Sequence, residues 1–149
     1  MATRRKKAQI GQSSEDAASA ARALVASINA HDVGLLISLL TGDHVLIDGL
    51  GARMGGLEKL KKAWTGYFSM VPDYWIRIDQ ELVSGTTVVL LGTAGGTLAV
   101  GGRVDPENRW SVPAAWRAVV ASGRIVEWQI YADNEPIRAH MRRAGLIGS

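Results

Sequence analysis

Apolar residues recur at helical spacing in the first part of the chain. From Ala17 to Ile28 they stand three and four residues apart, which is the period of a helix that buries one face. Ser14 can cap this helix, and Asp32 can cap a second, short helix that ends at Thr41 and Gly42. The pattern therefore predicts two consecutive helices ahead of the first strand.

Residues 57–70 form the third predicted helix, which carries a stripe of large apolar side chains. The stripe consists of Leu57, Leu60, Trp64, Tyr67 and Phe68. Such a stripe buries a large apolar area. It is either ordinary core or, in part, the roof of a cavity for a flat apolar ligand.

The period changes to that of strands on either side of the third helix. A short strand is predicted at 44–48, and aromatic or aliphatic residues alternate with charged ones over 74–83, as in a half-exposed strand. Residues 86–93 are β-branched and apolar, which predicts a central strand buried on both faces. We interpret 101–108 as a loop that leads into the last two strands.

The last two strands, 110–120 and 124–133, form a predicted hairpin. A three-residue loop at 121–123 would place Arg117 opposite Glu127 and Trp116 opposite Trp128. A two-residue loop would place Arg117 beside Trp128, so we prefer the longer loop.

One face of the final strand is polar, because four polar side chains follow one another at a spacing of two. They are Glu127, Gln129, Tyr131 and Asp133. This face is either wet surface or the lining of a pocket. A short helix is then expected from Glu135 onward, because Pro136 suits a first helical turn.

The order of these elements indicates an α+β fold. Helices on one side of a strongly curved, mostly antiparallel sheet enclose space, so we expect a cone with an internal cavity. The chain of 149 residues fits a single domain at 14–149, and residues 1–13 are expected to form a flexible basic arm.

Charge and composition exclude several classes of protein. The net charge is +3, and four basic residues at 4–7 account for more than all of it. The domain itself is therefore not basic, and we expect neither a nucleic-acid nor a membrane partner. The absence of cysteine excludes disulfides and thiolate chemistry, and the N-terminus has no signal-peptide core, so cytoplasm is the default location.

The sequence offers no pattern for a metal or a cofactor. His31, His44 and His140 show no ligand spacing, and we assign them surface or capping roles. The glycines at 92–102 lack the lysine and helix of a phosphate loop. We therefore expect no metal and no cofactor.

Several short segments of the chain match one family in order and spacing. They are residues 28–32 (INAHD), 48–51 (DGLG), 55–58 (GGLE), 72–74 (PDY), 123–128 (GRIVEW) and 131–133 (YAD). Over 14–141 the chain resembles the nuclear transport factor 2-like superfamily of cone-shaped proteins. The resemblance is strongest to its SnoaL-like and ketosteroid-isomerase-like branches. The superfamily contains isomerases, cyclases, epoxide hydrolases and binding proteins, so the fold does not choose among them.

The resemblance implies a general base at Asp48. Ketosteroid isomerases carry an aspartate in an Asp-x-x-Gly turn, and Asp48 to Gly51 matches that turn. Their two oxyanion donors would fall near Leu24 and Ala115, whose side chains donate no hydrogen bond. One such donor lowers the reaction barrier by ~3–4 kcal/mol, so the loss of both argues against steroid isomerisation by this arrangement.

The resemblance implies a second candidate base at Asp133. SnoaL-like cyclases use an aspartate of the final strand as base, and Asp133 resembles it. Epoxide hydrolases of this fold add an Arg-x-Asp pair, which would fall near Gly92 and Ala94 and is missing. Either carboxylate is a base with a pKa raised by an apolar cavity, or simply a group that holds a turn or caps a helix.

Three functions remain open. The first is a cofactor-independent isomerase or cyclase that acts on a hydrophobic polycyclic or terpenoid-like molecule, with Asp48 or Asp133 as catalytic base. The second is a non-catalytic carrier of an apolar ligand, and the third is a structural dimerisation domain. We expect a homodimer through the exposed sheet face. The candidate ligand-binding residues are Trp64, Tyr67, Phe68, Trp75, Trp116, Arg117, Trp128, Gln129 and Tyr131.

Overall fold

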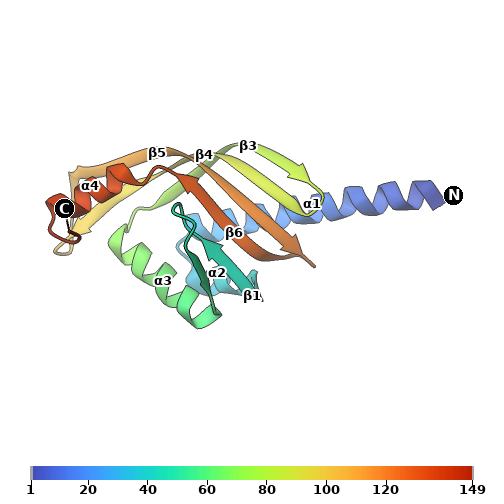
Figure 1. Cartoon of the computed structure of the whole chain (residues 1–149), viewed down its shortest axis with the longest axis horizontal. Coiled ribbons are helices and arrows are strands. Elements are labelled where there is room, and N and C mark those ends of the chain that lie inside the picture. Colours follow the sequence, from blue (N-terminus) through green and yellow to red (C-terminus); the bar gives the residue numbers. More distant parts are fainter. Residues whose placement is uncertain (1, 149) are drawn as a thin grey trace.

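The structure is a computed structural model that describes the backbone of residues 2–148 and the side chains of 13–148. Ten helices and strands follow one another along this part of the chain (Figure 1). In chain order they are α1 (Ala2–Asn29), α2 (Val33–Ser38), β1 (Leu40–Ile47), β2 (Arg53–Gly55), α3 (Leu57–Met70), β3 (Trp75–Ser84), β4 (Thr87–Val100), β5 (Arg103–Ala121), β6 (Arg124–Ala132) and α4 (Glu135–Arg143).

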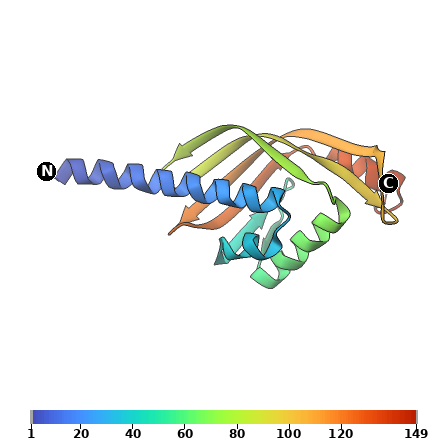
Figure 2. The same ribbon diagram turned by 180° about the vertical axis from the view of Figure 1, so that it is seen from behind.

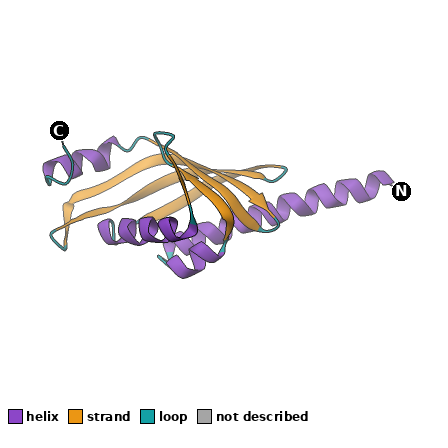
Figure 3. Cartoon of the chain, turned by 60° about the horizontal axis from the view of Figure 1, so that its bottom comes forward, coloured by secondary structure: helices purple, strands orange, loops and turns teal. Residues whose placement is uncertain are grey.

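The six strands form one sheet in the order β2-β1-β6-β5-β4-β3. β1 and β6 pair in parallel, and the other neighbouring strands pair antiparallel. The sheet is strongly curved, and α1, α2 and α3 lie on its concave side (Figure 2). Figure 3 shows α4 beyond one end of the strands. The predicted α+β fold with a curved, mostly antiparallel sheet is confirmed.

Helix α1 packs its small apolar face against the concave side of the sheet. Ala17, Ala21, Leu24 and Ile28 are buried, as the helical spacing predicts. The helix begins at Ala2 instead of Ser14, so the backbone of the predicted arm is helical. The basic side chains at 4–7 lie outside the described side chains. No helix in the described part of the chain is long and apolar enough to cross a membrane.

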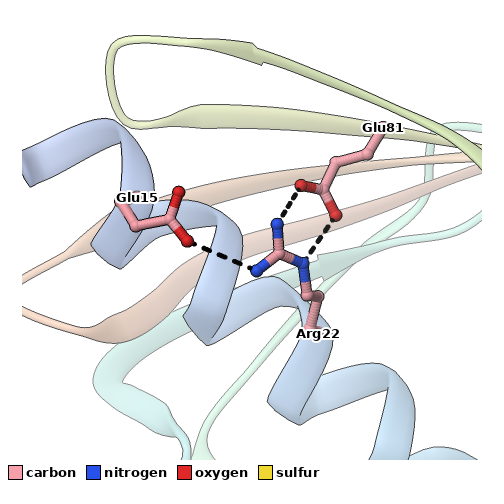
Figure 4. A network of polar contacts seen from close by, with 3 residues as sticks. All are labelled: Glu15, Arg22 and Glu81. Carbon is pink, nitrogen blue, oxygen red and sulfur yellow. Dashed lines mark hydrogen bonds and ion pairs between the residues drawn. The ribbon is translucent and has the colours of Figure 1, made fainter. Parts of the chain in front are cut away.

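Polar side chains attach α1 to β3, which is an edge strand of the sheet. The Asn29 amide accepts a hydrogen bond from Ile76 N at 2.8 Å and donates one to Ile76 O at 3.0 Å, as a neighbouring strand would. Arg22 donates two hydrogen bonds to Glu81, with Glu15 on its other side (Figure 4). The Glu81 hydrogen bonds raise the pKa of Arg22, so α1 presents a fixed cation to the strand.

The residues after Asn29 connect three elements. His31 Nε2 donates to Tyr74 O at 2.7 Å, and the imidazole stacks on Phe68 with ring centroids 4.2 Å apart. Asp32 accepts a hydrogen bond from Leu35 N at 3.0 Å and caps α2, which confirms the predicted cap. This short connection therefore joins α1 to α3 and to the start of β3.

The structure corrects three details of the predicted strands. Strand β1 begins at Leu40, not at His44. The helical spacing places Leu40 in the second helix, but in the structure Leu40 pairs with Ile125 of β6. Strand β2 at Arg53–Gly55 was missed, since three exposed residues give no strand pattern. The loop predicted at 101–108 shrinks to a turn at Gly101 and Gly102, both with positive φ, and the strands on either side extend into it.

The β5–β6 hairpin has the two-residue loop that we rejected. Ser122 and Gly123 both have positive φ, and Ala121 pairs with Arg124. A bulge beside Val119 and Val120 then shifts the register. Arg117 therefore pairs with Gln129, not with Glu127, although its Nη1 still donates to Glu127 Oε1 at 2.6 Å.

Close backbone contacts explain why β4 needs glycine. An added Cβ at Gly92 would lie 1.8 Å from Arg77 O, and one at Gly96 would lie 2.3 Å from the Val71 side chain. Both distances are far shorter than the contacts that real Cβ atoms make. Glycine therefore allows β3 and the end of α3 to approach β4 where the sheet bends.

His44 and His140 are buried, so the predicted surface or capping role is wrong for both. His44 Nδ1 donates to Ile125 O at 2.8 Å across the β1–β6 pair. Burial lowers the pKa of His44 below its ordinary value of 6.5, although this hydrogen bond and the nearby Asp43 and Glu127 oppose the shift. The fold therefore favours the neutral imidazole.

We expect Gly92→Ala to lower the free energy of unfolding by about 1–3 kcal/mol, because the methyl group must displace the Arg77 backbone. Gly66→Ala is the matched control, since a Cβ there meets nothing within 4 Å on helix α3. That change should stabilise the protein by roughly 0.5–1 kcal/mol. Urea unfolding of both variants measures the difference, and equal stability would refute the proposed close approach.

We expect the stability of the fold to fall as the pH drops below about 6.5. In the unfolded chain His44 takes up a proton near its ordinary pKa of 6.5. In the folded protein its pKa is lowered, so the unfolded state binds more protons below pH 6.5 and acid favours unfolding. Urea unfolding between neutral pH and pH ~5 tests this linkage. The His44→Asn variant should show a shallower loss over the same interval, and an unchanged slope would exclude His44 as its origin.

Candidate functional site

A cavity of about 470 Å³ opens on the concave side of the sheet. Its walls come from β1 and the turn after it, from α3, from the residue before β3, and from β4, β5, β6 and α4. Most of the side chains that face it are apolar, among them Leu46, Ala63, Met70, Val112, Ile130 and Met141. This volume lies within the usual range of small-molecule sites.

Strand β5 supplies one wall through a strict alternation of inward and outward side chains. Trp110, Val112, Ala114 and Trp116 all line the cavity. The intervening residues point to the outer face, because successive side chains of a strand alternate. On β6, Ile130 and Ala132 line the cavity in the same way.

The polar face of the final strand is therefore outside the cavity. Gln129 and Tyr131 alternate with the inward residues, and Tyr131 is 51% exposed. Arg117 lies opposite Gln129 on the outer face and pairs with Glu127. Of the two alternatives for this face, the structure places it at the surface of the chain.

The structure brings together only some of the predicted ligand-binding residues. Trp64, Tyr67 and Trp116 line the cavity with one another. Phe68 and Trp128 are buried in the core without lining the cavity. Trp75, Arg117, Gln129 and Tyr131 are also absent from its walls.

Asp48 lies at the cavity in an exposed turn. Its Oδ1 accepts hydrogen bonds from Leu50 N and Ala52 N, both at 2.9 Å. These bonds hold the turn that follows β1 and fix the carboxylate. Oδ2 accepts no hydrogen bond from the described residues, so it is available to a ligand.

Asp133 does not line this cavity. Its side chain is exposed, and Oδ1 accepts a hydrogen bond from Glu135 N at 2.9 Å. The carboxylate thus bonds to a free backbone N–H in the first turn of α4. The structure does not place Asp48 and Asp133 in one enclosed space.

Several lining residues were missed by the sequence analysis. Tyr74 and Trp110 line the inner wall, and Asn134, Arg138 and Met141 contribute from the start of α4 and the helix itself. The period-two pattern of β5 would have identified Trp110. The contribution of α4 has a weaker signal, because only its position in the fold shows that it borders a cavity.

Two tyrosines and a tryptophan, which carry hydrogen-bond donors, are among the residues that line the cavity. Burial raises the pKa of Tyr67, and burial together with the neighbouring Tyr67 raises that of Tyr74. Both hydroxyls are therefore protonated at neutral pH. Trp110 Nε1 is buried and has no hydrogen-bond partner among the described residues.

Neither of the two positions that the resemblance gives to the ketosteroid-isomerase donors lines the cavity. Leu24 is buried in the core, and Ala115 pairs with Tyr131 on the outer face. Ala114, the inward neighbour of Ala115, also lacks a donor. Among the described residues, no group of three or more histidine, aspartate and glutamate side chains could hold a metal ion.

Comparison with known proteins points to one family. The family model of the SnoaL-like domain matches residues 21–128. No curated protein matches the sequence significantly.

Solved structures share the fold over most of the chain. A protein from Jannaschia sp. CCS1 assigned as a SnoaL-like polyketide cyclase has a TM-score of 0.73 at 16% identity, covering 91% of this chain and 96% of that one. A ketosteroid isomerase-like protein of Catenulispora acidiphila, in complex with trimethylamine, gives 0.71 at 22%, covering 86% and 93%. An LEH-like epoxide hydrolase of M. tuberculosis gives 0.69 at 19%, covering 89% and 94%. At these identities the comparisons show a common fold.

Proposed function

We propose that this chain, which belongs to the SnoaL-like domain family, binds a small hydrophobic molecule in its cavity. On that molecule it performs cofactor-independent acid–base chemistry. The reaction class is an isomerase or cyclase step on a polycyclic or terpenoid-like substrate. Asp48 is the general base. The observation that carries this proposal is a carboxylate in the wall of an otherwise largely apolar cavity.

The surroundings of Asp48 suit a general base. A base must reach the proton that it removes. Oδ1 is anchored by two backbone N–H groups, whereas Oδ2 accepts no hydrogen bond from the part of the chain that the structure describes. The two hydrogen bonds to Oδ1 thereby position the Asp48 carboxylate and leave Oδ2 to accept a proton. Asp133 remains a second candidate from the resemblance, but its bond to Glu135 N favours a role at the start of α4.

Donors in the cavity wall complement this base. Removal of a proton next to a carbonyl places negative charge on the carbonyl oxygen, and a hydrogen-bond donor at that oxygen stabilises it. Tyr67, Tyr74 and Trp110 are the candidate donors. A non-catalytic carrier is the second candidate function, and the exposure of Asp48 favours it, since a solvated carboxylate is a weak base.

We expect Asp48→Asn to abolish proton abstraction without disturbing the fold, because the asparagine oxygen can still accept the turn hydrogen bonds. The probe is 2-tetralone, whose exchange of α-hydrogen for deuterium in D2O is followed by NMR. The wild type should accelerate exchange, and Asp48→Asn should reduce the acceleration by at least about 100-fold. Asp133→Asn tests the second candidate base, and it should remain within about twofold of the wild type because Asp133 Oδ1 bonds to the backbone at the start of α4.

Quenching of tryptophan fluorescence by the same ketone measures binding separately. Binding without any acceleration of exchange by the wild type would favour the carrier. Full activity of Asp48→Asn would reject Asp48 as the base.

We also propose that the outer sheet face forms a homodimer and that the protein acts in the cytoplasm. Val89, Leu91 and Ala115 lie half-buried on this face, beside Arg117 and Val119. Strand β4 is predicted to be buried on both sides, yet its outer side chains are only half covered within one chain. A second copy would remove this apolar surface from water.

We expect Leu91→Glu to convert the dimer to a monomer, because it places a charge in the centre of the apolar outer face. Val104→Glu is the control, since Val104 is 50% exposed near the β4–β5 turn. Light scattering after size exclusion should give twice the 16.0 kDa chain mass for the wild type and the control. A wild type that elutes as a monomer at all concentrations would contradict the proposed dimer.

A further inference from the structure

The exposed residues of the cavity wall come from two neighbouring elements. They are Asp48, Gly49 and Leu50 in the turn after β1, and Asn134 and Arg138 at the start of α4. The two elements lie against each other, because a Cβ added at Gly49 would be 3.1 Å from Asn134 Nδ2. We call these five residues the mouth of the cavity.

The mouth carries one anion and one cation. Among the described residues that line the cavity, Asp48 and Arg138 are the two with a charged side chain. The buried part of the wall is formed by apolar and aromatic side chains such as Trp64, Val112 and Trp116. A charged group of a ligand would lose its hydration there without gaining a partner of opposite charge. The mouth is therefore the place where such a group can bind.

Helix α4 brings Arg138 to the mouth through its local geometry. Arg138 N donates a hydrogen bond to Asn134 O at 3.0 Å, and residues four apart share one face of a helix. Ile137 and Met141 also line the cavity and give this side of α4 an apolar surface. The methylene chain of an arginine can cover such a surface while its guanidinium stays in contact with water.

The guanidinium of Arg138 is not engaged by the fold. The other two arginines of α4 have partners, since Arg142 pairs with Glu135 and Arg143 donates a hydrogen bond to His140 Nδ1 at 2.7 Å. Within the part of the chain that the structure describes, the side chain of Arg138 makes neither a hydrogen bond nor an ion pair. Its N–H donors are left to water or to a ligand.

A carboxylate is the ligand group that suits this cation. A planar guanidinium can donate two parallel hydrogen bonds to a carboxylate, so that both oxygens are bound at once. A neutral amide oxygen in the same place gains less, because hydrogen bonds between charged groups are the stronger ones. Asp48 adds a negative charge to the mouth, so a doubly charged phosphate would be repelled more strongly than a carboxylate.

We propose that Arg138 binds a carboxylate of the ligand at the mouth of the cavity, so that the substrate class is an apolar ring system with one carboxylate. This inference rests on the proposed ligand-binding function of the cavity. It orients the ligand, because the rings enter the apolar interior while the charged end stays beside Arg138. The end that carries the carboxylate is therefore the end that faces Asp48, the proposed base.

Matched ligands test the carboxylate site separately from the cavity. 2-Naphthoate and 2-naphthamide share a flat two-ring skeleton and differ in charge. Their affinities for the full-length protein are measured by calorimetry at low and at high salt. We expect 2-naphthoate to bind about three- to tenfold more tightly at low salt. This preference should shrink at high salt, because ions screen an exposed pair of charges.

Substitutions on α4 assign the preference to one side chain. Arg138→Gln should weaken 2-naphthoate binding about three- to tenfold and leave 2-naphthamide binding unchanged. Arg138→Lys keeps the charge without the planar fork and should restore only part of the preference. Arg142→Gln is the matched control, because it removes the same charge from the same helix at a residue that does not line the cavity. It should preserve the preference within about twofold, and thermal unfolding checks that each variant is folded.

The outcomes separate the two proposals. If the wild type binds both compounds equally and Arg138→Gln changes neither affinity, the carboxylate site is refuted while the apolar cavity stands. An equal loss in Arg142→Gln would also refute it, because the preference would then follow the net charge of the helix. Tighter binding of 2-naphthyl phosphate or of 2-naphthylmethylammonium would refute the assignment of a single carboxylate. If none of the four compounds binds, the proposed function fails, and the inference that rests on it fails with it.

Discussion

The close approach of β4 to its neighbours is the constraint on which the rest of the structure depends. At Gly92 the Arg77 carbonyl, and at Gly96 the Val71 side chain, occupy the space that a Cβ would need. These contacts let the sheet bend where β3 and the end of α3 meet β4. The bend produces the concave side against which α1 and α3 pack, and the cavity lies on that side.

The distribution of polar groups around the cavity decides which chemistry the site supports. Neutral donors of Tyr67, Tyr74 and Trp110 lie among apolar walls, whereas the carboxylate of Asp48 sits in an exposed turn. A base near solvent and donors in an apolar wall are the two elements that proton abstraction next to a carbonyl requires. The same distribution serves a carrier, since binding needs the donors without the base.

The sequence predicted the elements better than their pairing. Helix α3 and the Asp32 cap follow from local spacing and appear as expected. The register of the last hairpin does not follow, because the two-residue loop and a single bulge each shift the pairing by one residue in the same sense, so Arg117 pairs with Gln129 instead of Glu127. Even so, the predicted proximity of Trp116 and Trp128 holds, with ring centroids 6.4 Å apart, because large side chains reach their diagonal neighbours.

The amino-acid sequence by itself determined the fold class, the helical faces and the presence of Asp48 in a tight turn, because these depend on period and on local backbone bonds. It gave no way to decide which face of the last strand turns inward, because a period of two marks two faces without naming the buried one. The tertiary structure decided that Gln129 and Tyr131 lie outside and that Asp133 bonds to the α4 backbone. It also brought Tyr74 and Trp110 together from distant parts of the chain, since only the packing of the curved sheet against the helices sets that contact.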